Sequence, residues 1–182
     1  MASAAITWTP GGGANIISQE VNYRIYGTTS WTSAVTGLSS TASSYTITGL
    51  ADNTLYEFDV VSDCSIGGPI SSGIMQGIKW YCPTISATAT HNTVSYNFSA
   101  LSGSISGYTV QLMDSGLTTV IQTLTTITGV FTSGTIAPST NYKIRLILAA
   151  GVLTHTCTPE TSIATIAAPT CPTPTLTGAT LT

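Results

Sequence analysis

Apolar and polar residues alternate in short segments along the chain, and clusters rich in Gly, Ser and Thr separate these segments. Alternation places successive side chains on opposite faces of an extended backbone, so it predicts half-buried β-strands. No stretch repeats apolar residues with the period of an amphipathic helix. The sequence therefore predicts an all-β protein, with strands at 5–9, 20–26, 44–48, 55–62 and 73–79 and then at 84–90, 93–99, 107–114, 118–124, 129–133, 141–149 and 162–167.

The chain also repeats itself. Tyr56 and the alternating segment around it recur at Tyr142, which is 86 residues later. Offsets that drift by a few residues are expected where loops of different length join equivalent strands. We therefore predict two domains, 1–80 and 81–170, followed by a tail at 171–182. Three further landmarks keep a similar separation, namely Tyr23 and Tyr108 (85 residues), Trp8 and Tyr96 (88 residues), and the Cys-Pro-Thr triplets at Cys82 and Cys171 (89 residues).

A spaced motif precedes each of the two tyrosines: the second repeat has Ile136, Pro138, Thr140 and Tyr142, and the first has Leu50, Thr54 and Tyr56 with Asp52 in place of Pro. This motif resembles Leu-x-Pro-x-Thr-x-Tyr, the turn into strand F of fibronectin type III domains. The resemblance implies two tandem immunoglobulin-like β-sandwiches, each with a tyrosine corner whose hydroxyl binds nearby backbone. It also implies that Trp8, with Tyr96 as its counterpart, is a core residue of strand B. Core side chains are expected at Trp8, Tyr56, Val60, Val94, Tyr142 and Ile144.

The first repeat has no counterpart of the strand that opens the second. Residues 84–90 resemble strand A of the family, and the equivalent segment of the first repeat would lie before Met1. The first domain is therefore expected to start at strand B and to lack its own strand A. A sandwich without this strand leaves backbone N–H and C=O groups unpaired along one edge, which proteins usually cover.

The tail at 171–182 resembles the strand A that the first domain lacks. We therefore predict that it pairs, antiparallel, with 4–9 in a neighbouring copy of the chain, by donor-strand complementation. Two alternatives stay open: the tail docks on another protein, or it is the start of a third domain. The predicted interface consists of Leu176, Ala179 and Leu181 on the donor and Ala5, Ile6 and Thr7 on the acceptor, with Leu176 and Leu181 buried.

The four cysteines can be paired from the topology that the resemblance implies. Strand A of this fold starts at the pole where strand F ends, so Cys82 is expected near Cys157 and Cys64 near a donated Cys171. Whether either pair is oxidised depends on the compartment, and thiols are an equal alternative.

The composition of the chain limits the classes of partner that it is expected to bind. Only 6% of the residues are charged, the net charge is −3, and four residues are Lys or Arg, so the chain has no basic stripe for nucleic acid. Its apolar runs are far shorter than the ~20 residues of a membrane-spanning helix. The N-terminal residues show neither the basic nor the apolar region of a signal peptide, so none is expected.

Candidate chemistry is sparse. Cys82, His155 and Cys157 could form a soft-metal cluster, but no paired short Cys spacing occurs, and we expect His155 and His91 to be loop residues. The seven carboxylates are scattered, and Glu57 and Asp59 are expected to face solvent. We therefore predict no enzyme activity, metal or cofactor.

Tyr26 and Trp31 flank a turn and could stack on sugar rings; the alternative is that they cap the edge of the sandwich. Carbohydrate therefore stays open as a ligand, and a protein that binds it here would be a module of a larger secreted protein.

Tandem sandwiches that are rich in Thr and Ser and poor in charge resemble bacteriophage virion proteins, such as capsid decoration or tail-associated modules. The resemblance implies a structural subunit of a virion or an extracellular filament. Its partners would be copies of itself, arranged head to tail, or other proteins of the assembly. The alternative is an adhesin or carbohydrate-binding module from a larger bacterial protein.

Overall fold

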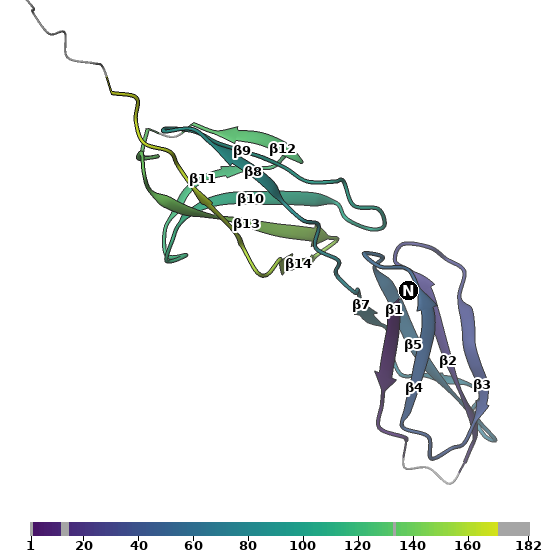
Figure 1. Ribbon diagram of the computed structural model, residues 1–182. Helices are drawn as coiled ribbons and strands as arrows, with labels where there is room; N and C mark the ends of the chain where they lie inside the picture. The colour runs from purple at the N-terminus through teal and green to yellow at the C-terminus, as the bar shows by residue number, and fades with distance from the viewer. Residues whose placement is uncertain (1, 12–14, 133, 171–182) are drawn as a thin grey trace, which may run out of the picture. The chain divides into compact units, whose positions relative to one another are not determined.

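The computed structural model describes residues 2–11, 15–132 and 134–170 (Figure 1). All regular secondary structure in these ranges is strand, which confirms the all-β prediction. Accordingly, the described residues include no helix that is long and apolar enough to cross a membrane.

The chain divides into two compact units. The first comprises Met1–Pro83, Ala100–Tyr108 and Leu148–His155, and the second comprises the other residues that the structure describes. The division predicted from the repeat, at residues 80 and 170, stays a prediction. We describe the strands as a first sandwich, β1 to β7, and a second sandwich, β8 to β15.

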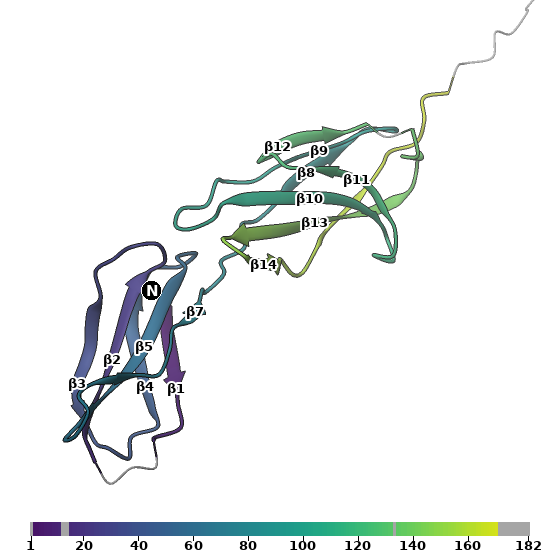
Figure 2. The same cartoon turned by 180° about the vertical axis from the view of Figure 1, so that it is seen from behind.

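The first sandwich packs a small sheet on a larger one (Figure 2). Alternating residues of both sheets face inward, so that Val21, Ile47, Phe58 and Val60 are buried between them. Within the described ranges, the small sheet consists of β1 (Ala2–Thr7) and β4 (Ser44–Leu50). The larger sheet consists of β3 (Thr32–Leu38), β2 (Ile16–Ile25) and β5 (Tyr56–Cys64), with β6 (Ile70–Ser71) and β7 (Met75–Gly77) both pairing with β5.

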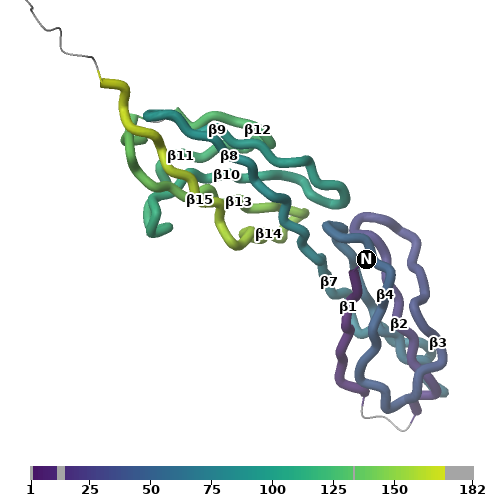
Figure 3. The backbone as a smooth tube through the Cα atoms, viewed as in Figure 1, coloured from purple at the N-terminus to yellow at the C-terminus, as the bar shows by residue number. Residues whose placement is uncertain are grey.

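The second sandwich has the same two layers (Figure 3). Strand β13 shows the alternation most clearly, because every second residue from Tyr142 to Ala150 is buried. One sheet consists of β12 (Thr128–Phe131), β9 (Val94–Asn97) and β8 (Ser86–Ala89). The other consists of β11 (Val120–Leu124), β10 (Gly107–Asp114), β13 (Asn141–Ala150) and β14 (Leu153–Thr156), with β15 (Thr161–Ala164) also pairing with β13.

Both sandwiches contain the predicted tyrosine corner. The Tyr56 hydroxyl accepts a hydrogen bond from the backbone N–H of Ala51 at 3.1 Å, and the Tyr142 hydroxyl accepts one from Ala137 at 2.7 Å. The preceding turns match as well, because Asn53 and Ser139 have positive φ angles of 54° and 53°. The corner prediction is confirmed at both sites.

Each of the twelve predicted strands overlaps a strand of the structure, with ends shifted by a few residues, but β3, β6 and β14 were not predicted. Five of the six predicted core residues are buried, and the exception is Trp8, which is partly buried. The prediction that Trp8 is inaccessible is therefore wrong. Trp8 directly follows β1 and lines a groove beside it, and its indole N–H donates to the side chain of Gln19.

Candidate functional site

One edge of strand β1 has no partner strand among the described residues. On its other edge, β1 pairs with β4, and the backbone N–H of Trp8 donates to Ser43 at 2.9 Å. In an antiparallel pair the residues that bond to the partner alternate along the strand. Trp8, Ile6 and Ala4 therefore bond to β4, while the N–H and C=O groups of Ser3, Ala5 and Thr7 point outward.

A groove lies along this edge. Its volume is about 520 Å³. The lining consists of residues 4–9, which include most of β1, residues 58–60 of β5, and residues 72, 73 and 75–77, the last three of which form β7. Its surface includes Phe58 and Val60 from the core and the side chain of Met75, which is 68% exposed. A smaller cavity of about 210 Å³ adjoins it and shares Ala4, Phe58 and Gly77 with it. The groove thus combines apolar side chains with unpaired backbone groups.

The second sandwich fills the corresponding position with its own strand. β8 pairs with β9, and beyond its end the backbone N–H of Ile166 donates to the carbonyl of Thr90. The alternating exposure of β8 leaves Ala87 and Ala89 half-buried. The groove of the first sandwich is therefore the place where a strand like β8 belongs.

Gly77 contributes to the opening. It pairs with Tyr56 across β5 and β7, as Ile163 pairs with Tyr142 across β13 and β15. The first sandwich therefore has no side chain where the second has a half-buried Ile163. A Cβ at Gly77 would lie 3.2 Å from the Phe58 ring, so the core also favours glycine here.

The structure describes one half of the predicted donor interface. Ala5 and Thr7 are exposed, Ile6 is half-buried, and all three line the groove. The donor residues Leu176, Ala179 and Leu181 lie outside the described residues, so their pairing with β1 stays a prediction. The sequence predicted a strand at 73–79, but it did not indicate that this strand, β7, lines the groove.

Three of the four cysteines are described. Cys82 and Cys157 are disulfide-bonded, and their sulfur atoms lie within 4.8 Å of each other and of a ring nitrogen of His155. Because a thiolate is the form of cysteine that ligates metals, the bonded sulfurs do not favour a metal here. His155 belongs to strand β14, so its prediction as a loop residue is wrong. Cys64 is a free thiol; Cys171 lies outside the described ranges, and its predicted pairing with Cys64 stays a prediction.

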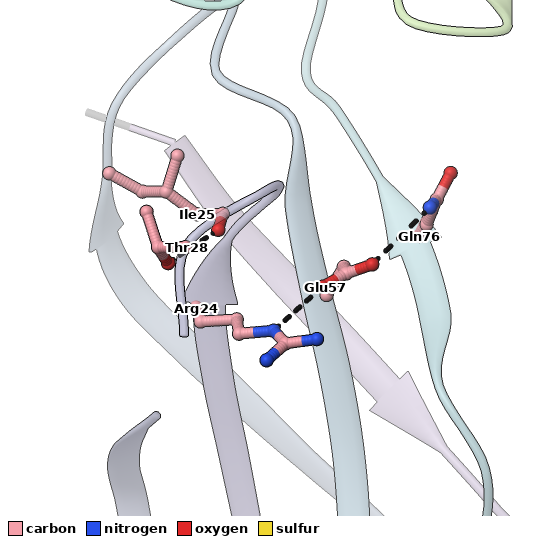
Figure 4. Close-up of polar contacts among 5 residues, drawn as sticks. All are labelled: Arg24, Ile25, Thr28, Glu57 and Gln76. Atoms are coloured by element: carbon pink, nitrogen blue, oxygen red, sulfur yellow. Dashed lines mark hydrogen bonds and ion pairs between the residues drawn. The ribbon is translucent and has the colours of Figure 1, made fainter. Parts of the chain in front are cut away.

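Glu57 does not face solvent as predicted. It is buried, and its carboxylate accepts a hydrogen bond from Arg24 on β2 at 2.7 Å and one from Gln76 on β7 at 3.4 Å (Figure 4). A carboxylate held between two strands in this way is a cross-strand link of the larger sheet. Sequence alternation missed it because the Arg24 side chain of a neighbouring strand reaches over Glu57.

The aromatic pair is only partly accessible. Tyr26 is 45% exposed and Trp31 is 36% exposed. The guanidinium of Arg24 lies 4.4 Å from the centre of the Trp31 ring, in a cation–π contact. One face of this ring is therefore occupied by the protein itself, which leaves less aromatic surface for a sugar.

Solved structures with this arrangement exist. The chain resembles a segment of two fibronectin type III domains from chicken tenascin, with a TM-score of 0.56 and 14% sequence identity over 89% of this chain and 90% of that one. The fold is that of tandem fibronectin type III domains. The FN1–FN3 domains of chicken CNTN1 also match, with a TM-score of 0.41 and 16% identity over 90% of this chain and 62% of that one. No family model matches the chain, and no curated protein matches it.

Proposed function

We propose that this chain is a non-enzymatic structural subunit of a virion or an extracellular filament, in which residues 171–182 of one copy fill the groove of the next. The observation that carries the proposal is the unpaired edge of β1 beside an apolar groove. A strand bound there would satisfy the outward N–H and C=O groups of Ser3, Ala5 and Thr7 and cover Met75. The tail is the segment of this sequence that resembles such a strand.

The charge of the chain is consistent with a partner of its own kind. The groove is lined by a single charged residue, Asp59, and the tail has none, so no like charges would meet in the interface. An interface between two different surfaces of one chain is heterologous, and repeating it closes a ring or extends a fibre. Copies of the chain, with other assembly proteins at the ends, are the partners that fit this geometry. We propose that this assembly belongs to a virion or lies outside the cell.

Solution mass tests the proposal directly. Sedimentation of the full chain should show species larger than the monomer that grow with concentration, and a chain lacking 171–182 should sediment as a monomer. A peptide of residues 171–182 should bind the truncated chain and raise its unfolding temperature. A peptide with Leu176→Asp is the matched control. Assembly of the truncated chain to the same extent as the full chain would refute the proposal.

A second candidate is an adhesion or carbohydrate-binding module, which is favoured by the exposure of Tyr26 and Trp31. Binding to a glycan array should then depend on Trp31 and not on the tail. A Trp31→Ala variant that loses glycan binding while remaining folded would support this candidate. Absence of glycan binding by the intact chain would remove it.

A further inference from the structure

In the second sandwich, β8 pairs with β9 in a known register, and this pair indicates how the tail would pair with β1. We propose that the donated strand pairs with β1 in one register, with Leu176 opposite Trp8 and Thr177 opposite Thr7. This inference rests on the proposed function and deepens it. It also changes one expectation, because Leu176 and Leu181 are five residues apart and lie on opposite faces of a regular strand. Leu176 then faces the groove, and Leu181 faces solvent.

The first step is to relate β1 to β9. Tyr45 of β4 precedes Tyr56 by the same number of residues as Phe131 of β12 precedes Tyr142, so the two positions are equivalent relative to the tyrosine corners. Across the sheet, Tyr45 pairs with Ile6 and Phe131 pairs with Val94. Ile6 is therefore the counterpart of Val94. Two residues further along, Trp8 is the counterpart of Tyr96, as the repeat in the sequence also indicates.

The second step is to place strand A on this frame. In the second sandwich Ala87 lies opposite Tyr96, and Thr88 lies opposite Ser95. The Cys-Pro-Thr triplets that precede the two strand A-like segments are 89 residues apart. Applying this offset places Leu176 at the position of Ala87 and Thr177 at the position of Thr88. Leu176 then faces Trp8, and Thr177 faces Thr7.

The hydrogen bonds provide an independent check. The backbone N–H of Thr90 donates to Thr93 at 2.9 Å, in register with the β8–β9 ladder. Because bonding residues alternate, Ser95 also bonds toward β8. Its counterpart in the first sandwich is Thr7, whose N–H and C=O point to the open edge. A register shifted by one residue would turn the donor strand over and place Leu176 on the solvent face, so Leu176 faces the groove only in the proposed register or in one shifted by an even number of residues.

The register makes Leu176 the apolar anchor of the tail. Trp8 is partly buried, and it lines the groove together with Val60 and Met75. A leucine opposite Trp8 would complete its cover, as β8 covers Tyr96, which is only 4% exposed. Gly178 would lie opposite Ile6 and add no side chain there. One leucine rather than two would therefore supply most of the apolar contact.

Disulfide trapping between two kinds of chain tests the register. The background carries Cys64→Ser and Cys171→Ser, and the acceptor chain carries Thr7→Cys and lacks 171–182. The donor chain carries one cysteine at Thr175, Thr177 or Ala179, which all lie on the same face of the strand. Because a disulfide requires closely apposed Cβ atoms, Thr177→Cys should crosslink at least roughly tenfold faster than the other two.

The outcomes separate this inference from the proposed function. Fastest crosslinking at Thr175 or Ala179 would overturn the register while leaving strand donation intact. No crosslink at any position, together with assembly that does not depend on 171–182, would overturn both. A donor with Leu176→Ala in addition to Thr177→Cys should crosslink at least about tenfold more slowly, whereas Leu181→Ala should leave the rate unchanged. A larger loss from Leu181→Ala would show that the buried leucine is the other one.

Discussion

In the described part of the chain, strand β9 of the second sandwich has a partner strand at each edge, whereas the equivalent strand β1 of the first sandwich has one partner. The two sandwiches otherwise share the tyrosine corner, the turn that precedes it and the order of the main strands. One strand therefore accounts for the main difference. Its effect reaches the core, because Tyr96 is buried while its counterpart Trp8 is only partly so. The presence or absence of one edge strand therefore goes with full or partial burial of the aromatic side chain at this position.

The largest expected difference is in the two cores. Phe131→Ala should destabilise the second sandwich by about 3–5 kcal/mol, because Phe131 is fully buried. Trp8→Ala should cost less than this in a chain lacking 171–182, because the Trp8 side chain is partly solvated there. Urea unfolding of the two truncated variants measures the difference. Equal costs would mean that the open groove does not expose Trp8 in solution.

The next effect compares the open edge of β1 with the equivalent edge of β9, which is paired with β8. Proline at Thr7 removes an N–H that points to the open edge, so Thr7→Pro should leave the truncated chain close to its original stability. Ser95→Pro removes the equivalent N–H between β9 and β8, and the unsatisfied partner should cost about 1–3 kcal/mol. Thermal unfolding compares the two variants. Thr7→Pro in the full chain should also abolish assembly, and its retention would contradict the proposed pairing.

Smaller effects are expected at the corners, where the sandwiches are alike. Tyr56→Phe and Tyr142→Phe each remove one hydroxyl that accepts a backbone N–H. Each should therefore cost about 1 kcal/mol, and the two costs should be similar. Chemical denaturation of each variant measures them. A much larger cost at one corner would contradict the expectation that the two hydroxyl groups contribute equally to stability.

The smallest effect concerns the turns after β2 and β10. Asp114 accepts hydrogen bonds from the backbone of Thr119 and from Thr118, which lower the pKa of this carboxyl group. A lowered folded-state pKa stabilises the fold above the unfolded value and loses this contribution as the pH falls through the folded value. Asp114→Asn should therefore flatten the stability profile below pH ~4. Thr28, in the turn after β2, bonds through a hydroxyl, so Thr28→Ala should not change the profile.

The sequence was sufficient for the strands that carry regular alternation and for both tyrosine corners, because these depend on local spacing. It missed β3, where Thr, Ser and Gly weaken the alternation over Thr32–Leu38, and it also missed β6, which has only two residues, and β14. The repeat also predicted an open edge beside the strand expected at 5–9, and among the described residues β1 pairs with β4 alone. The burial of Glu57 and the exposure of Trp8 could not be predicted, because each depends on what another strand does or does not place above the residue.

The single open edge of β1 would also set the valence of the proposed assembly. Each copy would offer one receiving edge and one donating tail, so the assembly would be unbranched, and an open fibre would have two chemically different ends. A soluble peptide of residues 171–182 would block only the end with an empty groove, and a truncated chain would block only the end with a free tail. Average length would then depend on which terminator is added and on its ratio to intact subunits, as in a step-growth polymer with a monofunctional stopper.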